Sequence, residues 1–382
     1  MTIRNAQDSW QQWQGRRVLI AAGGTGGHIF PALAVAQALA QFGAELHWVG
    51  SNRGLEARVV RDNHKISLTE LRFQGVRGRG LSALLSLPFR LLAAMLQCLR
   101  LVREFRPSLV LVFGGYVCFP VGMAAWLQRI AFVVHEQNAV MGTANRWLAR
   151  LAARVLTSFA PTRLSPASAV CVGNPVRPEL LMQARALGRP RGEGQALRLL
   201  VIGGSLGARA LNQALPEAVA ASQSSWPQGI FVRHQTGMSE QAEVQARYQA
   251  LGLDAGQVQV QAFIDDMAQA YAWADLVVAR AGASTVSELV ALGLPAVFVP
   301  LPNAIDDHQT ANAQAMVQAN AALLLKQSPE LALTLGQCLS QLNPSRLKAM
   351  ADNAQGLAQG PSSLENYLKV LASLGSPDKA AL

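Results

Sequence analysis

The chain carries one local pattern twice: a short apolar run, then a glycine-rich turn, then a helix-forming stretch. The first copy is Arg17–Ala22 followed by Gly23–His28, and the second is Leu199–Ile202 followed by Gly203–Gly207. Amphipathic helical stretches alternate with further candidate strands, which are residues 45–49, 109–113, 131–135 and 154–157 after the first copy and residues 229–234, 257–261, 276–279 and 296–299 after the second. Strands that alternate with helical crossovers form parallel sheets with helices on both faces. The pattern therefore predicts an α/β chain of two Rossmann-like, doubly wound domains that face a deep cleft at the carboxyl edges of their sheets.

Two breaks in the pattern predict where the domains meet. A Pro/Gly-rich stretch, Val172–Pro178, and a polar run, Gly188–Gly194, separate the two copies. We therefore expect an N-terminal domain over residues 1–175 and a C-terminal domain over residues 176–361. The last helical stretch, residues 362–378, follows a Gly-Pro break, and we expect it to pack back on the N-terminal domain.

Composition limits the class of protein. The 382 residues are 51% hydrophobic and 15% charged, which supports a sizeable core and excludes a disordered chain. A net charge of +10 favours nucleic acid, an anionic membrane or a phosphate-rich substrate as partner. The four cysteines lie far apart, which indicates neither a disulfide framework nor a zinc site and favours a reducing compartment. We expect no signal peptide in the polar N-terminus, and no stretch reaches the roughly 18 apolar residues of a spanning helix.

The two glycine-rich turns are suited to phosphate, because free N–H groups and the positive end of a helix dipole converge there. One turn in each domain favours two phosphate-bearing ligands. We expect the first helix to begin at Pro31, since proline is tolerated in a first helical turn. The fingerprint of dinucleotide enzymes fails, because Ile29 stands where its third glycine belongs and Gly50-Ser51 supplies no acid after the second strand.

The second turn also allows a different class of enzyme. Gly203-x-Ser205-x-Gly207 satisfies the nucleophile elbow of serine hydrolases, and the Asp306-Asp307-His308 run could complete a triad. However, the duplicated pattern gives Ser205 the same phosphate-loop position as Thr25, and a hydrolase would leave the first glycine turn without a role. We keep the hydrolase as the alternative to a phosphate-binding enzyme.

Several single residues allow both a functional and a structural interpretation. His28 ends the first glycine turn and faces the predicted cleft, so a functional role and a structural role both stay open for it. The pairs Asp265-Asp266 and Asp306-Asp307 resemble metal-binding carboxylates, but such pairs more often cap helices or face solvent. We expect the structural role for both pairs and therefore no metal site.

These residues belong to a set of motifs that stand in order along nearly the whole chain, from about Arg17 to the last helix. The set resembles the MurG family of N-acetylglucosaminyltransferases, which make lipid II from lipid I. Its motifs are Gly23–His28, His135–Asn138, Gly173–Arg177, Gly203–Ala208, Phe263–Met267 and Ala283–Glu288. The resemblance implies a GT-B fold and an inverting transfer of N-acetylglucosamine from UDP-N-acetylglucosamine to the 4-hydroxyl of undecaprenyl-linked lipid I. It implies no cofactor and no metal.

The resemblance also implies roles for individual residues. Arg177 and Ile264 would flank the uracil, Ser205 would meet the diphosphate, Glu288 would accept from the ribose hydroxyls, and Gln309 would contact the sugar. His28 would handle the proton of the acceptor hydroxyl. His308 departs from members of the family that carry two glutamines here, which puts the first of those sugar contacts in doubt. The implied donor site consists of Thr25, Gly26, Gly27, Asn138, Arg177, Ser205, Ile264, Ala283, Ser284, Thr285, Val286, Ser287, Glu288 and Gln309.

One arginine-rich, apolar segment, residues 72–106, predicts contact with a lipid surface. Leucines and Phe89 are interleaved there with arginines, of which Arg72, Arg77, Arg79 and Arg90 are expected to face the membrane. Part of the segment is also expected to pack on the sheet as an amphipathic helix. Few aromatic residues and no binding-module signature argue against nucleic acid. The family places such an enzyme peripherally on the cytoplasmic face of the inner membrane, with other proteins of cell-wall synthesis and division as candidate partners.

Overall fold

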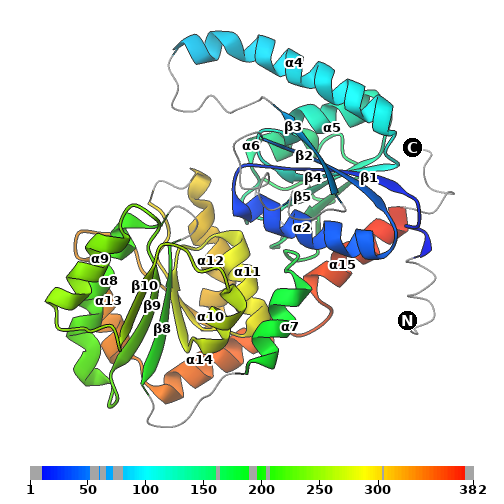
Figure 1. Ribbon diagram of the computed structural model, residues 1–382. Coiled ribbons are helices and arrows are strands. Elements are labelled where there is room, and N and C mark those ends of the chain that lie inside the picture. Colours follow the sequence, from blue (N-terminus) through cyan, green and yellow to red (C-terminus); the bar gives the residue numbers. More distant parts are fainter. Residues whose placement is uncertain are drawn as a thin grey trace. The chain divides into compact units, whose positions relative to one another are not determined.

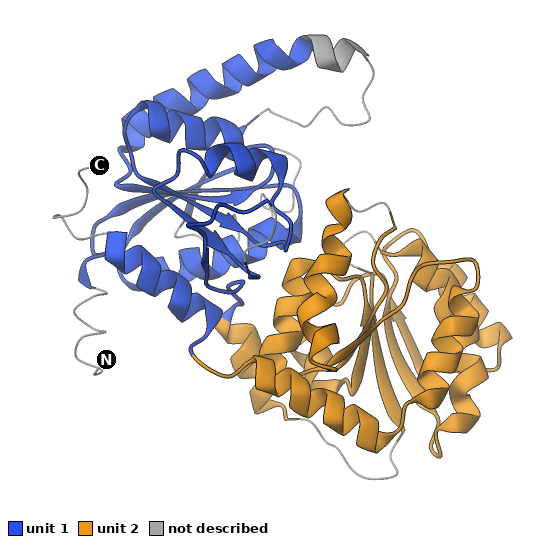
Figure 2. Cartoon of the chain, turned by 180° about the vertical axis from the view of Figure 1, so that it is seen from behind, with its two compact units in different colours: residues 1–177, 361–382 blue, residues 178–360 orange. Residues whose placement is uncertain are grey.

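The computed structural model describes residues 11–51, 60, 66–71, 81–160, 164–188, 196–203, 207–302 and 305–374. The chain divides into two compact units (Figure 2). Unit 1 consists of Met1–Arg177 and Pro361–Leu382, and unit 2 consists of Pro178–Gly360. Each unit is built on its own sheet, and the labels of Figure 1 are used below.

Unit 1 contains a seven-stranded sheet in the order β3-β2-β1-β4-β5-β6-β7, in which every described pair of neighbours is parallel. Its strands are β1 (Arg17–Ala22), β2 (Glu45–Ser51), β3 (Ile66–Leu71), β4 (Leu109–Gly114), β5 (Phe132–Glu136), β6 (Arg154–Thr157) and β7 (Val170–Cys171). Its helices are α2 (Gly26–Gln41), α4 (Leu81–Phe105), α5 (Cys118–Leu127), α6 (Thr143–Leu148) and α15 (Ser363–Leu374).

Unit 2 contains a six-stranded parallel sheet in the order β10-β9-β8-β11-β12-β13. Its strands are β8 (Leu197–Ile202), β9 (Ile230–Gln235), β10 (Val258–Gln261), β11 (Leu276–Ala279), β12 (Ala296–Phe298) and β13 (Ala322–Leu324). Its helices are α7 (Pro178–Ala186), α8 (Arg209–Ser222), α9 (Gln241–Ala250), α10 (Met267–Trp273), α11 (Ala283–Leu292), α12 (His308–Gln318), α13 (Leu331–Gln341) and α14 (Pro344–Leu357), with short 3₁₀ turns at Gln223–Ser225 and Ile305–Asp307.

Both faces of each sheet are covered, which confirms the predicted α/β class with two parallel sheets. In β1, Val18 and Ile20 belong to a core shared with α2 and α15, whereas Leu19 and Ala21 belong to a core shared with α4 and α5. A strand that is buried on both faces needs apolar residues at every position, because successive side chains point to opposite faces. The continuous apolar runs in the sequence have this cause.

Helix α2 begins at Gly26, so the expected start at Pro31 was wrong. Thr25 has extended backbone angles, and its carbonyl accepts from the N–H groups of His28 and Ile29 at 3.1 and 3.3 Å, which closes the first turn. Pro31 therefore lies inside the helix, where it removes one backbone hydrogen bond. Gly26 and Gly27 form part of the first turn of the helix, so the free N–H groups of this turn lie close to the carboxyl end of β1.

The C-terminal helix α15 is part of the core of unit 1 and packs against α2 (Figure 1). Tyr367 is fully buried and stacks on Phe113 of β4, with ring centroids 5.7 Å apart. The same ring meets His135 of β5 edge-on at 5.4 Å. Unit 1 is therefore completed by residues from the far end of the chain.

We predict that Tyr367→Ala lowers the free energy of unfolding of unit 1 by about 3–5 kcal/mol, because it leaves a large cavity between the sheet and α15. Tyr367→Phe is the matched control. The hydroxyl of Tyr367 is buried without a partner among the described residues, so its removal should cost nothing and could stabilise the unit. Hydrogen exchange of β4 and β5 amides measures both effects. Equal protection in the alanine variant and the wild type would contradict this assignment of α15.

Candidate active site

The first glycine turn is held against a second turn that follows β4. Gly23 N–H donates to Gly114 O at 3.3 Å. A Cβ atom on Gly115 would lie 2.2 Å from Gly23 O, and one on Gly114 would lie 2.4 Å from His28 Nδ1. Gly114 and Gly115 also have positive φ angles, of 124° and 88° respectively. Only glycine fits at either position. The sequence analysis missed this pair, although two glycines directly after a buried strand were a visible signal.

One ring nitrogen of His28 contacts both β4 and the residue that follows β5. Its Nδ1 lies 3.2 Å from the carbonyl oxygen of Phe113, in β4. The same atom contacts the side-chain amide of Gln137, which follows β5. The imidazole is therefore fixed at the carboxyl edge of the sheet in unit 1, where α/β proteins bind their ligands.

A buried carboxylate organises the loop after β5. Glu136, 2% exposed, accepts hydrogen bonds from the backbone N–H and side-chain amide of Asn138 at 3.0 and 3.2 Å. It also accepts from Gly142 N–H at 3.0 Å and from the Asn145 amide at 2.9 Å. Glu136 therefore fixes the position of Asn138, one of the predicted donor-site residues. Sequence reasoning gave Glu136 no role of its own.

The side chain of His135 contacts residues near the end of the first chain segment of unit 1. Its Nε2 lies 3.3 Å from Asn174 Oδ1 and 3.2 Å from Ser158 Oγ. Burial lowers the pKa of His135 to about 4, so this imidazole is neutral at pH 7. Three residues after Asn174, the Arg177 guanidinium lies over the ring of Phe30 at 4.8 Å. Arg177 is thereby held beside the first turns of α2.

In unit 2, the start of α11 carries the predicted donor motif, residues 283–288. Gly282, the residue before the helix, is extended, and no side chain caps the helix. The N–H groups of its first residues therefore have no acceptor within the helix, which suits an anion. Ser284 Oγ is buried without a partner among the described residues. Val286 is buried and its N–H donates to Gly282 O at 3.0 Å, so it contributes packing.

Glu288 lies further along the same helix and is held by a neighbouring aromatic residue. The hydroxyl of Tyr271, in α10, donates to Glu288 Oε2 at 2.7 Å. Tyr271 is 1% exposed, so its ring cannot turn away without opening the core. Nothing in the sequence pattern pointed to Tyr271, because the contact joins two helices.

Ile264 and Gln309 both take part in internal hydrogen bonds. Ile264 is buried, and its N–H donates to the Gln235 side chain at 3.2 Å. Gln309 Oε1 accepts from Leu301 N–H at 2.9 Å, which fixes the orientation of the Gln309 amide. Ser205 lies outside the described residues, as do Arg72, Arg77 and Arg79.

Arg280 is a further organising residue that sequence reasoning missed. Its guanidinium donates to Val299 O at 2.9 Å, to Pro300 O at 3.1 Å and to the Gln327 side chain at 2.7 Å. Burial lowers the pKa of Arg280 without removing its charge. The loops that follow β12 and β13 are thereby tied to the end of β11.

The aspartate pairs have local structural roles. Asp266 caps α10 by accepting from Gln269 N–H at 2.9 Å. Asp307 precedes α12 and accepts from the Thr310 hydroxyl at 2.7 Å. Within the described part of the chain, no group of three or more His, Cys, Asp or Glu side chains is placed to hold a metal ion.

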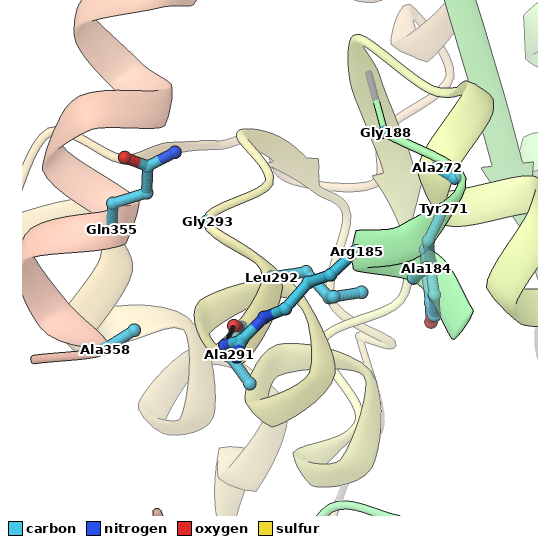
Figure 3. Close-up of a pocket in the computed structure, with 10 residues that line it drawn as sticks. All are labelled: Ala184, Arg185, Gly188, Tyr271, Ala272, Ala291, Leu292, Gly293, Gln355 and Ala358. Carbon is cyan, nitrogen blue, oxygen red and sulfur yellow. Dashed lines mark hydrogen bonds between the residues drawn. The ribbon is translucent and has the colours of Figure 1, made fainter. Parts of the chain in front are cut away.

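A cavity of about 560 Å³ lies in unit 2 between α7, α10, α11 and α14 (Figure 3). It is lined at the C-terminal end of α11 by Leu292 and Gly293, about 14 Å along the helix from Ala283. Arg185 donates to Ala291 O at 3.1 Å at its edge. This cavity is therefore separate from the uncapped N-terminus of α11, although Tyr271 contributes to its wall.

Comparison with known proteins agrees with this arrangement. The glycosyltransferase family 28 N-terminal domain matches residues 18–157, and the family 28 C-terminal domain matches residues 198–365. Two curated relatives carry the name UDP-N-acetylglucosamine–N-acetylmuramyl-(pentapeptide) pyrophosphoryl-undecaprenol N-acetylglucosamine transferase. The one from Pseudomonas putida is 47% identical, covering 91% of this chain and 94% of its own. The one from Alkalilimnicola ehrlichii is 49% identical, covering 90% and 94%.

Solved structures give the same result. The crystal structure of MurG from Acinetobacter baumannii is 36% identical, covers 94% of this chain and 99% of its own, and superposes with a TM-score of 0.73. A glycosyltransferase of kitacinnamycin shares the fold at 16% identity, with a TM-score of 0.65 and coverage of 95% and 100%. The comparisons lend no support to the serine hydrolase alternative. With both units matched and nine-tenths of its length aligned, the chain belongs to glycosyltransferase family 28 and, within it, to the MurG family of N-acetylglucosaminyltransferases.

Proposed function

We propose that this chain transfers N-acetylglucosamine from UDP-N-acetylglucosamine to undecaprenyl-linked lipid I, giving lipid II and UDP. The observation that carries the proposal is the identity of 47% and 49%, along about nine-tenths of the chain, to relatives whose names state this reaction. The site geometry supports it, because each unit presents helical N–H groups at the carboxyl edge of its sheet. Such groups stabilise phosphate oxygens without a metal ion.

The donor is proposed to bind unit 2. The uncapped start of α11 faces the diphosphate with its N–H groups, and Glu288 accepts from the ribose hydroxyls. Tyr271 supports this role, since it fixes one carboxylate oxygen of Glu288 and so sets the orientation of the other. Ser205, Ile264 and Gln309 complete the proposed contacts to diphosphate, uracil and sugar.

The acceptor is proposed to react at His28. The acceptor hydroxyl forms a bond to the anomeric carbon while the bond from that carbon to the diphosphate oxygen breaks, with inversion. UDP leaves with the electron pair of the broken bond, and His28 takes the hydroxyl proton. A positioned base of this kind typically contributes about 10²–10⁴-fold in rate. The competing role for His28 is a hydrogen bond to the diphosphate of the acceptor.

We also propose that unit 1 binds an anionic lipid surface. No helix in the described part of the chain is long and apolar enough to span a bilayer. On α4, Phe89, Leu92 and Leu96 are 77%, 57% and 59% exposed, while Ala94, Cys98 and Val102 face the core. Arg100 and Arg103 continue the exposed face at helical spacing. An apolar stripe that runs into cations matches the profile of a lipid interface.

The neighbouring helices also expose apolar residues. Helix α5, which packs against α4, exposes Trp126 and Leu127, and α6, which packs against α5, exposes Trp147. Arg150 lies over the Trp147 ring at 4.8 Å. Of the arginines expected at the membrane, the described part of the chain contains Arg90, which is half-buried on α4. The apolar stripe therefore supports the proposal more directly than that arginine does.

The direct test of the proposed reaction is transfer of labelled sugar from UDP-N-acetylglucosamine to a soluble lipid I analogue, with and without EDTA. We expect UDP and the disaccharide product in equal amounts, with at most a modest loss in EDTA. Release of free sugar without acceptor-dependent product would overturn the transfer reaction. Complete loss in EDTA, restored by a divalent cation, would overturn the metal-independent mechanism alone.

We predict that Glu288→Ala weakens UDP binding about 10- to 100-fold, since charge-assisted hydrogen bonds contribute about 1.5–3 kcal/mol. Tyr271→Phe should weaken it less, by about 3- to 10-fold, because the carboxylate remains but loses its support. Isothermal titration calorimetry measures both dissociation constants. Glu243→Ala, which changes an exposed glutamate on α9, is the control and should bind as the wild type does. An unchanged dissociation constant for Glu288→Ala would show that the ribose assignment is wrong.

We predict that replacing Phe89, Leu92 and Leu96 together with Ser weakens binding to anionic vesicles about 100-fold, which corresponds to about 3 kcal/mol of lost apolar burial. High salt should release much of the wild-type protein, because it screens the arginine contribution. Vesicle flotation measures the bound fraction. The matched control replaces Met182, Met238 and Leu333, exposed apolar residues of unit 2, with Ser. Equal losses in both triple variants would argue against a lipid-binding surface on α4.

A further inference from the structure

The contacts of His28 determine which of its ring nitrogens carries the proton. Nδ1 has two neighbours, the carbonyl oxygen of Phe113 and the side-chain amide of Gln137. A backbone carbonyl can only accept a hydrogen bond, so the Phe113 contact is favourable only if Nδ1 is protonated. A neutral imidazole carries one proton. Protonation at Nδ1 therefore leaves Nε2 with its lone pair.

Gln137 can match either form of the ring, because its amide has a donor end and an acceptor end of nearly the same shape. In the structure the Gln137 nitrogen faces Nδ1 and the Gln137 oxygen is turned away. That orientation requires an unprotonated Nδ1, which would then repel the Phe113 carbonyl. With the oxygen toward Nδ1, both neighbours accept from the same N–H group. The carbonyl of Phe113 is fixed in β4, whereas the Gln137 amide can turn. The arrangement with two favourable contacts places the Gln137 oxygen against Nδ1–H.

The contact with His28 explains why a polar residue is buried at position 137. The side chain is 1% exposed, and the amide atom that does not face His28 is buried without a partner among the described residues. A buried polar group without a hydrogen-bond partner destabilises the folded state. Leucine or methionine would fill the same space without that cost. The one hydrogen bond that the described structure gives to the Gln137 side chain is the one to His28.

Building on the proposed role of His28, we infer that Gln137 is a positioning residue that holds His28 in the Nδ1–H form, so that Nε2 is the atom that receives the acceptor proton. Two titratable groups lie close to this pair. His135 of β5 is neutral because of burial, and the Glu136 carboxylate accepts its hydrogen bonds from Asn138, Gly142 and Asn145. Gln137 and the Phe113 carbonyl, both uncharged, therefore decide between the two forms of the ring.

The first test observes the imidazole of His28 directly in the wild-type protein. Long-range ¹⁵N–¹H correlation spectra of the ¹⁵N-histidine-labelled protein distinguish the two neutral forms of each imidazole, and comparison with His28→Ala assigns the His28 signals. We expect the Nδ1–H form for His28 at pH 7.5. Observation of the Nε2–H form would overturn the inference, whatever the reaction of the enzyme proves to be.

The second test compares two substitutions of similar size. Gln137→Leu cannot accept a hydrogen bond, so we expect kcat to fall about 10-fold while the KM for UDP-N-acetylglucosamine stays unchanged. Gln137→Glu can only accept, so we expect kcat at high pH within a few-fold of the wild type. Because the new carboxylate stabilises the imidazolium, the acidic limb of the pH profile should move to higher pH by about one unit or more. A purely structural role for Gln137 predicts that both variants lose activity and thermal stability together.

The outcomes separate this inference from the proposed function. If His28→Ala keeps a near-normal kcat with a raised KM for the acceptor, His28 binds the acceptor and is not its base, while the spectra still report which nitrogen carries the proton. If His28→Ala loses kcat but Gln137→Glu is as inactive as Gln137→Leu, then Gln137 does not act as an acceptor and the inference is wrong. Hydrogen exchange of the β4 and β5 amides checks that unit 1 of each variant is folded, because His28 and Gln137 both belong to unit 1.

Discussion

Unit 1 depends on one close approach of backbone to backbone. The turn after β1 and the turn after β4 meet at Gly23, Gly114 and Gly115, with space for no Cβ atom at the last two positions. Because those turns touch, the first turn of α2 lies over β4, and the His28 ring reaches the Phe113 carbonyl. Any side chain at Gly114 or Gly115 would separate the turns and move the imidazole. The position of the proposed base therefore follows from the absence of two side chains.

Unit 2 also contains a glycine at which two backbone segments come into close contact. A Cβ atom on Gly207 would lie 2.1 Å from Thr236 O, which brings the start of α8 against the end of β9. A buried chain of hydrogen bonds then supports the contact. His234 joins the Tyr248 hydroxyl and the Asn212 side chain at 3.1 Å each, and Asn212 donates to Thr236 O at 2.9 Å. Burial lowers the pKa of His234 to about 3, so this link stays neutral at the pH at which cells work.

Two carboxylates, Glu136 in unit 1 and Glu288 in unit 2, accept hydrogen bonds from uncharged groups. The Glu136 carboxylate is stabilised by amide and backbone donors, with no ion pair among the described residues, and Glu288 is held by a phenol. Neutral donors leave the negative charge in place and fix its direction, whereas a lysine or arginine partner would compete with a ligand for the same oxygen atoms. This arrangement suits a site that must exchange a nucleotide repeatedly.

Much of this protein was determined by local sequence. Apolar runs buried on both faces required parallel sheets, and glycines after β1 and β8 marked the turns at their carboxyl edges, since both features depend on residues that are neighbours in the chain. The edge strands β3, β7 and β13 escaped prediction. The side chains of β3 and β7 are half-exposed or exposed and carry a weak apolar signal, and β7 and β13 are only two and three residues long. The motifs identified the family, because many residues stand in one order over the whole chain.

The tertiary structure alone decided the contacts between residues that are far apart in the chain. The start of α2 at Gly26 depends on how the glycine turn packs on β4, which overrides the local preference for proline in a first turn. The supports of the proposed site residues, Gln137 for His28 and Tyr271 for Glu288, come from other elements of the fold. A side chain's partner across two strands or two helices depends on register and packing, and no spacing along the sequence encodes those. The sequence therefore determined which groups are available for the chemistry, and the fold determined how each one is held.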